Sequence, residues 1–202
     1  MQRIPAISDA NGPEPQAYTY DLKPEEERQL RTKMLALAAD AIRARAQQLA
    51  AEMAGPAEPV RPSPRHHQRT AAKPIQPDFE NVQFRVFDLS NSNEPVLVLT
   101  ANARLPQSST ARAKLPPDLP YMIALVARQD SNGDLHKALV NVTDSQHLDV
   151  VPRLELIDAV DADGDGRGEL LFRQISDSGS GFVVYRVIGD QLYALFQGAS
   201  GS

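Results

Sequence analysis

Residues 121–142 read YMIALVARQDSNGDLHKALVNV, and this stretch decides the fold. Its two apolar runs, 121–128 and 135–142, are rich in the aliphatic, aromatic and β-branched residues that are typical of strands. Between them lies Asn132-Gly133, a dipeptide typical of a two-residue type I′ hairpin turn. The stretch therefore predicts two antiparallel strands joined by a tight turn.

The same alternation of short apolar runs and turn residues continues on both sides of this hairpin. Gly189-Asp190 separates two further apolar runs and predicts a second hairpin, whereas the Pro- and Ser-rich residues 102–120 predict a loop. Consecutive strands joined by hairpins predict a mainly β fold, an antiparallel meander of about eight strands that forms a sheet, a sandwich or a partial propeller. We expect the strands over 82–89, 95–105, 121–128, 135–142, 154–159, 169–175, 182–188 and 191–196.

One long amphipathic helix is predicted over residues 21–55, ahead of the β strands. Pro24 suits a first helical position, the acids at 25–27 suit the positive end of the helix dipole, and Gly55-Pro56 suits the end. Its apolar stripe is narrow and rich in alanine, and a helix of this length extends roughly 45 Å, further than a small β domain. We therefore expect a protein partner or self-association through residues 24–54, with a solitary helix lying on solvent as the alternative.

The remaining segments divide the chain into four parts. Residues 1–20 are polar and Pro-rich and are expected to be disordered. Residues 56–78 form a basic, Pro-rich linker that is also expected to be disordered, and residues 79–199 form the β domain. The linker has no aromatic residue on which a base could stack, so we expect a solvated segment and no nucleic-acid partner.

Composition limits the remaining possibilities. The chain has 202 residues, 42% of them hydrophobic, which is enough for one core. It has no cysteine, which excludes disulfides and thiol nucleophiles. No apolar run is long enough for a transmembrane helix, and the first twenty residues do not resemble a secretory signal. We expect an extracytoplasmic protein if an export signal lies outside this chain, and a cytoplasmic one otherwise.

The most informative chemical motif is DADGDGRGE at residues 161–169. Like-charged carboxylates about 4 Å apart repel by about 1 kcal/mol in bulk water and about 4 kcal/mol near a protein surface. Calcium, which takes roughly six to eight oxygen ligands, would offset this repulsion. The alternative is an exposed acidic turn whose glycines take unusual backbone angles. The expected ligands are Asp161, Asp163, Asp165, Glu169 and the backbone carbonyl of Arg167. Asp158 is expected to contact these ligands from outside the ring that binds the ion.

The spacing of this loop excludes an EF-hand. With Asp161 as position 1, the required acid at position 12 is replaced by Phe172. The loop instead resembles the calcium-binding hairpin of FG-GAP and VCBS-type β repeats, known from integrin-like propellers, with Glu169 in place of the final Asp. That resemblance covers a single copy without the Phe-Gly and Gly-Ala-Pro signatures, and it implies an extracytoplasmic binding or scaffold module. Residues 142–172 are also similar to uncharacterised acidobacterial proteins.

These features favour a non-enzymatic, calcium-stabilised β binding or scaffold module with a helical association segment. Two alternatives stay open: a hydrolase with a structural calcium, and an assembly protein driven by the helix. The hydrolase would use Asp144, Ser145 and His147, which lie within one short segment. A catalytic triad also needs an oxyanion hole and a nucleophile held by separate elements, and no motif indicates them.

Overall fold

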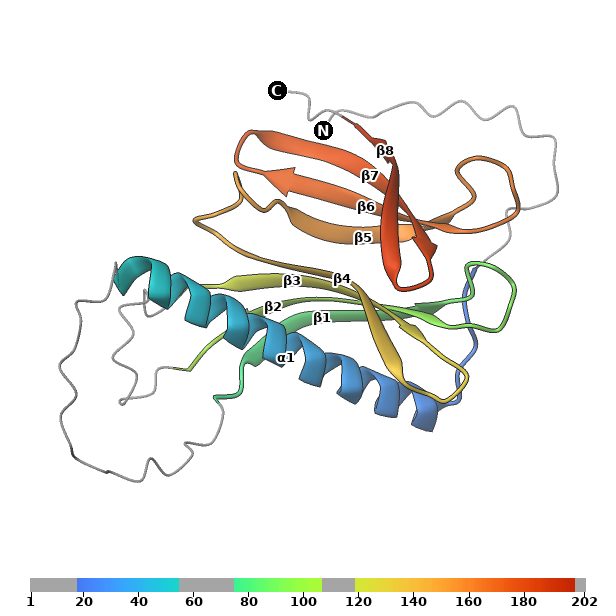
Figure 1. Ribbon diagram of the computed structural model, residues 1–202, viewed down its shortest axis with the longest axis horizontal. Helices are drawn as coiled ribbons and strands as arrows, with labels where there is room; N and C mark the ends of the chain where they lie inside the picture. Colours follow the sequence, from blue (N-terminus) through green and yellow to red (C-terminus); the bar gives the residue numbers. More distant parts are fainter. Residues whose placement is uncertain (1–17, 55–74, 107–118, 199–202) are drawn as a thin grey trace.

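The computed structural model describes residues 18–54, 75–106 and 119–198. Within them one long helix is followed by eight antiparallel strands (Figure 1), which confirms the predicted fold class. The elements are α1 (Pro24–Ala54), β1 (Asp78–Phe87), β2 (Val96–Arg104), β3 (Tyr121–Gln129), β4 (Leu135–Asp144), β5 (Arg153–Val160), β6 (Glu169–Ser176), β7 (Gly179–Ile188) and β8 (Gln191–Gln197).

The strands form two stacked sheets, and α1 lies across the outer face of the first one (Figure 1). The first sheet contains β1 to β4 and the second contains β5 to β8, each in chain order. Every strand therefore pairs with its neighbour in sequence, and the meander is interrupted once, between β4 and β5. Of the arrangements left open by the sequence, the structure has two stacked sheets, with the helix as a third layer.

The first sheet carries buried apolar residues on both faces, which divides the hydrophobic core in two. On one face Leu97 and Leu99 pack with the buried residues of α1. On the other face Val98 and Val126 pack with Phe172 of the second sheet. The unbroken apolar run of β2 is explained by this arrangement, since a strand buried on both faces does not alternate between polar and apolar residues.

The apolar stripe of α1 is buried along most of its length. The acids at 25–27 lie in its first turn, as predicted. The helix packs on β2, β3 and β4, so the chain's own sheet covers the stripe for which we expected a partner. Association through residues 24–54 stays a prediction. The buried positions are Leu30, Met34, Ala38, Ile42, Ala46 and Leu49.

The two predicted hairpins form, but the first turn is not of type I′. Such a turn needs a positive φ at both central residues, whereas only Gly133 has one, at 83°. Instead Gly133 N donates to the carbonyl of Asp130 at 3.0 Å, and Asp130 N donates to the carbonyl of Asp134 at 3.0 Å. The Asp130 carboxylate accepts hydrogen bonds from two backbone N–H groups of the turn, which favours this longer loop.

The predicted segment boundaries need one correction. Residues 1–20 were predicted to be disordered, and this prediction is wrong for the last of them. Thr19 forms a β-bridge with Phe87, and Tyr20 N donates to Val86 O at 3.1 Å. Tyr18 is buried in the core between the sheets. The predicted linker 56–78 lies outside the described residues up to position 74, and residues 107–118 of the predicted loop also lie outside them.

Asp130 makes the stability of the protein depend on pH in the acid range. A hydrogen bond with His136 and a backbone hydrogen bond from Asp134 lower the pKa of its carboxyl to about 2, from 3.8. As the pH falls, the unfolded chain therefore takes up this proton before the folded chain does. The contribution of Asp130 to the free energy of unfolding is complete above pH 4 and is lost as the pH falls towards 2.

We therefore expect Asp130→Asn to destabilise the protein at pH 6, and the difference from wild type to shrink between pH 4 and pH 2. Urea unfolding at a series of pH values measures this difference. A difference that does not change with pH would contradict the assignment.

Candidate metal centre

The acidic loop joins β5 to β6, at the edge where the second sheet approaches the β1–β2 connection of the first (Figure 1). Gly164 and Gly166 have φ values of 78° and 81°. This left-handed region is readily adopted by glycine and disfavoured for most other residues. Gly164 and Gly166, on either side of Asp165, therefore supply the two left-handed positions that this loop requires.

Three carboxylates of this loop come together. Oxygen atoms of Asp161, Asp163 and Glu169 all lie within 4.8 Å of one another. The two aspartates are exposed, whereas Glu169 is completely buried. The described part of the chain thus holds an acidic triad that could bind a metal ion, made from three of the predicted ligands.

Backbone N–H groups hold these carboxylates in place. Asp161 accepts hydrogen bonds from Gly164 N at 2.7 Å and from Gly166 N at 2.9 Å. Glu169 accepts one from Ala162 N at 2.8 Å. A carboxylate offers about four lone-pair positions, so each group keeps free positions for a cation.

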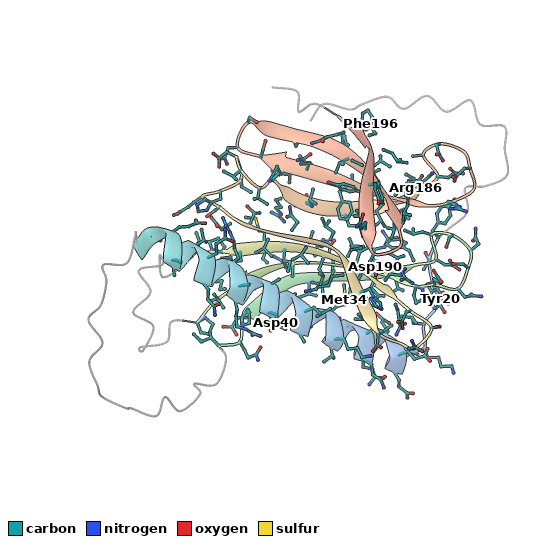
Figure 2. The ribbon with its side chains drawn as sticks, viewed as in Figure 1. Tyr20, Met34, Asp40, Arg186, Asp190 and Phe196 are labelled. Atoms are coloured by element: carbon teal, nitrogen blue, oxygen red, sulfur yellow. The ribbon has the colours of Figure 1, made fainter. Side chains whose placement is uncertain are left out.

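Arg186 of β7 is the residue that the sequence interpretation missed (Figure 2). Its Nη2 donates to Glu169 Oε1 at 2.6 Å and to Asp163 Oδ2 at 2.8 Å, and it lies 3.1 Å from Asp165 Oδ2. The hydrogen bond with Glu169 is the largest cause that raises the pKa of the Arg186 guanidinium above its ordinary value. Part of the repulsion that suggested calcium is therefore offset by a side chain of the protein.

The position of Arg186 follows from the register of the β6–β7 hairpin. Ser176 pairs with Gly179 at the turn, and Leu170 pairs with Tyr185 further along. One step beyond this last pair, Arg186 comes opposite Glu169. A basic residue that faces a buried acid across a predicted hairpin was thus a usable signal, once the turn had been placed.

Two other predicted site residues, Asp165 and Asp158, are not members of the triad. Asp165 contacts Arg186, and its carboxylate accepts a hydrogen bond from Arg167 N at 2.9 Å. Asp158, expected behind the ligands, instead pairs with Arg85 of β1 at 2.8 Å. This pair joins the two sheets, because β5 and β1 belong to different layers.

Gly168 attaches the loop to the first sheet. Its N–H donates to the carbonyl of Leu89 at 2.7 Å. A Cβ atom at this position would lie 2.8 Å from Cγ of Tyr18 and 3.0 Å from Cδ2 of Leu89, so the close approach requires glycine. Burial raises the pKa of the Tyr18 hydroxyl, and the loop carboxylates, Asp161 first among them, raise it further.

The donor set suits a hard cation. All three groups of the triad are carboxylates, and oxygen ligands favour calcium, magnesium or manganese over zinc or copper. Among the described residues, Arg186 is the one guanidinium that pairs with the loop carboxylates, and they outnumber it, so negative charge remains for a cation to neutralise.

The residues of the hydrolase alternative form only part of a catalytic arrangement. His147 Nδ1 lies 2.7 Å from the carboxylate of Asp144, which is completely buried. Ser145 is exposed, and among the described residues its hydroxyl makes no hydrogen bond with His147. The histidine and the aspartate belong to one turn, closed by the hydrogen bond from His147 N to Asp144 O at 3.2 Å.

Comparison with known proteins identifies no relative: no protein-family model, curated protein or solved structure matches the chain. The resemblance of the loop to FG-GAP and VCBS-type repeats stays a prediction. In the part of the chain that the structure describes, no helix combines the length and the apolar character needed to cross a membrane.

Proposed function

We propose that the chain is a non-enzymatic, calcium-stabilised β module in which the ion fixes the junction between the two sheets. One observation carries this proposal: oxygens of Asp161, Asp163 and Glu169 lie within 4.8 Å of one another. Calcium–oxygen bonds are about 2.3 to 2.6 Å long, so oxygens at such separations are able to share one calcium ion.

The position of the triad supports a structural role. The loop contacts the first sheet through Gly168 and Leu89, and it packs beside the buried Tyr18. An ion that fixes the loop would also fix these contacts between layers. Binding to the folded chain alone raises its stability by about 2.7 kcal/mol at a hundredfold excess over Kd.

Arg186 and calcium would compete for the same carboxylates. Without the ion, the guanidinium pairs with Glu169 and Asp163 and offsets one of their two negative charges. With the ion, those oxygens would be shared with a divalent cation, which repels the guanidinium. The proposal therefore includes two states of the loop, one held by arginine alone and one held chiefly by calcium.

Thermal melting with millimolar calcium and with chelator tests the proposal. We expect a higher Tm with calcium for wild type, and no calcium effect for Asp163→Ala, because that variant lacks one ligand of the triad. Asp177→Ala is the matched control, since Asp177 is an exposed acid in the β6–β7 turn. Equal melting temperatures of wild type in calcium and in chelator would contradict the proposal.

A further inference from the structure

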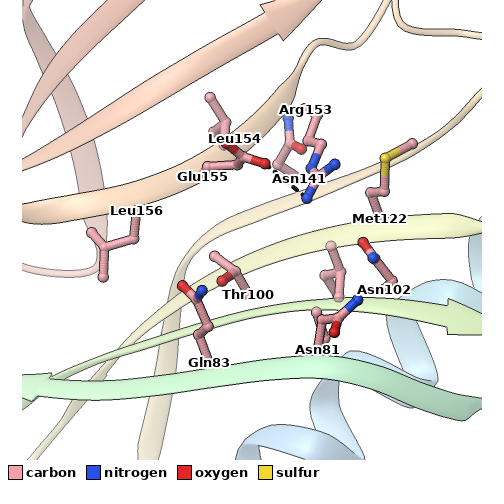
Figure 3. A pocket seen from close by; sticks show the side chains of 12 residues that line it. Asn81, Gln83, Thr100, Asn102, Met122, Asn141, Arg153, Leu154, Glu155 and Leu156 are labelled. Atoms are coloured by element: carbon pink, nitrogen blue, oxygen red, sulfur yellow. Dashed lines mark ion pairs between the residues drawn. The ribbon is translucent and has the colours of Figure 1, made fainter.

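A second polar site lies between the sheets, near the start of β5. It is a cleft of about 220 Å³ between the face of the first sheet and the first residues of β5 (Figure 3). Arg153, Leu154 and Glu155 of β5 line one side. The floor carries Asn81, Gln83, Thr100, Asn102, Met122 and Asn141, which come from β1 to β4.

The face of the first sheet changes character where this cleft begins. Along β2 the side chains that face the second sheet run from Val96 and Val98, which are buried in the core, to Thr100 and Asn102, which line the cleft. The opposite face of β2 stays apolar to Ala103, where α1 covers it. The polar residues of β2 therefore lie on the face towards the second sheet, beyond the buried core between the two sheets.

The side chains of the first sheet that line the cleft are amides, a hydroxyl and Met122, and the charged pair Glu80–Arg104 lies beside them on the same face. Gln83 pairs in register with Thr100, and Ala124 pairs with Asn141, so one row of the sheet carries three of these polar groups. Amides and hydroxyls both donate and accept hydrogen bonds, which suits a ligand with mixed donors and acceptors.

The backbone of β1 is distorted at the same place. Asn81 has a φ of 53°, and the register between β1 and β2 shifts between Glu80 and Gln83. Bulges of this kind redirect a side chain and are frequent beside binding sites. Asparagine tolerates the left-handed region better than most residues, so its amide occupies this position at moderate cost.

Among the described residues, several of these side chains form no hydrogen bond with the protein, and those of Asn81 and Gln83 are exposed. Within the described residues, Asn141 Nδ2 donates to Pro152 O at 3.2 Å, whereas no hydrogen bond joins the side chains of Asn81, Gln83 or Thr100 to the protein. Arg153 and Glu155 pair with each other at 2.8 Å (Figure 3), which leaves the cleft without excess charge.

We propose that this cleft binds a neutral, hydroxyl-rich ligand, a single sugar unit that is either free or at the end of a longer glycan. Sugar hydroxyls match amides, because both donate and accept. The paired charges give an ionic ligand no advantage, and none of the described residues that line the cleft is aromatic, so a planar ligand finds no ring to stack on there. The volume is below the roughly 300 to 1,000 Å³ of sites for drug-sized ligands, which favours one unit.

Heteronuclear NMR titration of the full chain tests this inference. The probes are glucose, galactose, mannose and N-acetylglucosamine, and a short oligomer of each. We expect at least one of them to give saturable shifts in the amides of β1, β2 and the start of β5. A larger affinity for the oligomer than for its monomer would assign the glycan end as the source, and equal affinities would assign the free sugar.

Two variants make the test specific. Thr100→Val removes a cleft hydroxyl with little change of shape and should weaken binding about tenfold, the effect of one lost hydrogen bond. Gln47→Leu, an exposed amide on α1, should leave binding unchanged. No saturable shifts with any sugar, equal binding by Thr100→Val, or shifts only with a neutral Gly-Ser peptide would overturn the inference.

The inference does not depend on the calcium loop. Arg153 is at the start of β5, whereas Asp161 follows its end at Val160. We expect Asp163→Ala to retain sugar binding under conditions in which it is folded. Failure of the calcium proposal and failure of the sugar proposal would thus be observed separately.

Discussion

Arg186→Gln is expected to destabilise the protein strongly in chelator, more than any exposed ion pair of the chain could. Glu169 is completely buried, and the substitution removes the cation from its carboxylate. Breaking a fully buried ion pair destabilises a protein by about 3 to 5 kcal/mol. The Arg186 side chain is 20% exposed and Glu169 keeps the hydrogen bond from Ala162 N, so we expect a loss at or below the lower end of this range.

Calcium should restore much of the stability that Arg186→Gln loses. The substitution removes the group that competes with the ion, so we expect the variant to bind calcium more tightly than wild type even though it is less stable without it. Urea unfolding and calcium titration by calorimetry measure the two quantities. Arg173→Gln, a change at an exposed arginine of β6, is the control and should alter neither.

These opposite effects separate two explanations of the loop. If the carboxylates only form an ion-pair network with Arg186, calcium will not stabilise the Arg186→Gln variant. If they form a calcium site, the stabilisation by calcium will be larger in the variant than in wild type. A variant that is equally unstable in calcium and in chelator would therefore rule out the calcium site.

Phe172→Ala is expected to lower the free energy of unfolding by about 3 to 5 kcal/mol. Phe172 is completely buried between the sheets, and its ring meets the ring of Tyr185 edge-on, with 6.1 Å between the centroids. The substitution leaves a cavity in the core that joins the layers. Denaturant unfolding with an unchanged m-value measures the loss.

Phe182→Ala is the matched control for this substitution. Phe182 lies on the neighbouring strand β7 and is 38% exposed. Its truncation removes less buried surface, and we expect a loss of about 1 kcal/mol or less. Equal losses for the two phenylalanines would contradict the position of the core between the two sheets.

The strands could be predicted from the sequence because local pattern decides them. The strand over 121–128 is an apolar run followed within a few residues by the turn at Gly133, and the other strands are apolar or partly alternating runs separated by turn residues. The prediction of a type I′ turn was wrong because it rested on Asn132-Gly133 alone. The Asp130 carboxylate, which lies outside that dipeptide, accepts hydrogen bonds from the turn backbone and favours a longer loop.

The loop carboxylates also lie close together in the sequence, but Arg186, which pairs with them, does not. Arg186 lies 17 residues beyond Glu169 and comes beside it only through the register of β6 and β7. The covering of α1 was missed for the same reason. A stripe of alanine and leucine shows that a face is apolar, but it does not show that β2 and β3 lie against it.

The pairing of every strand with its neighbour in the chain has a consequence for folding. Contacts between near neighbours need little loop closure, so each four-stranded sheet is able to assemble from its own segment. The contacts that join distant parts of the chain include the bridge between Thr19 and Phe87 and the contacts between layers, such as α1 on β3 and Gly168 on Leu89. The acidic loop thus lies at a place where distant parts of the chain must come together.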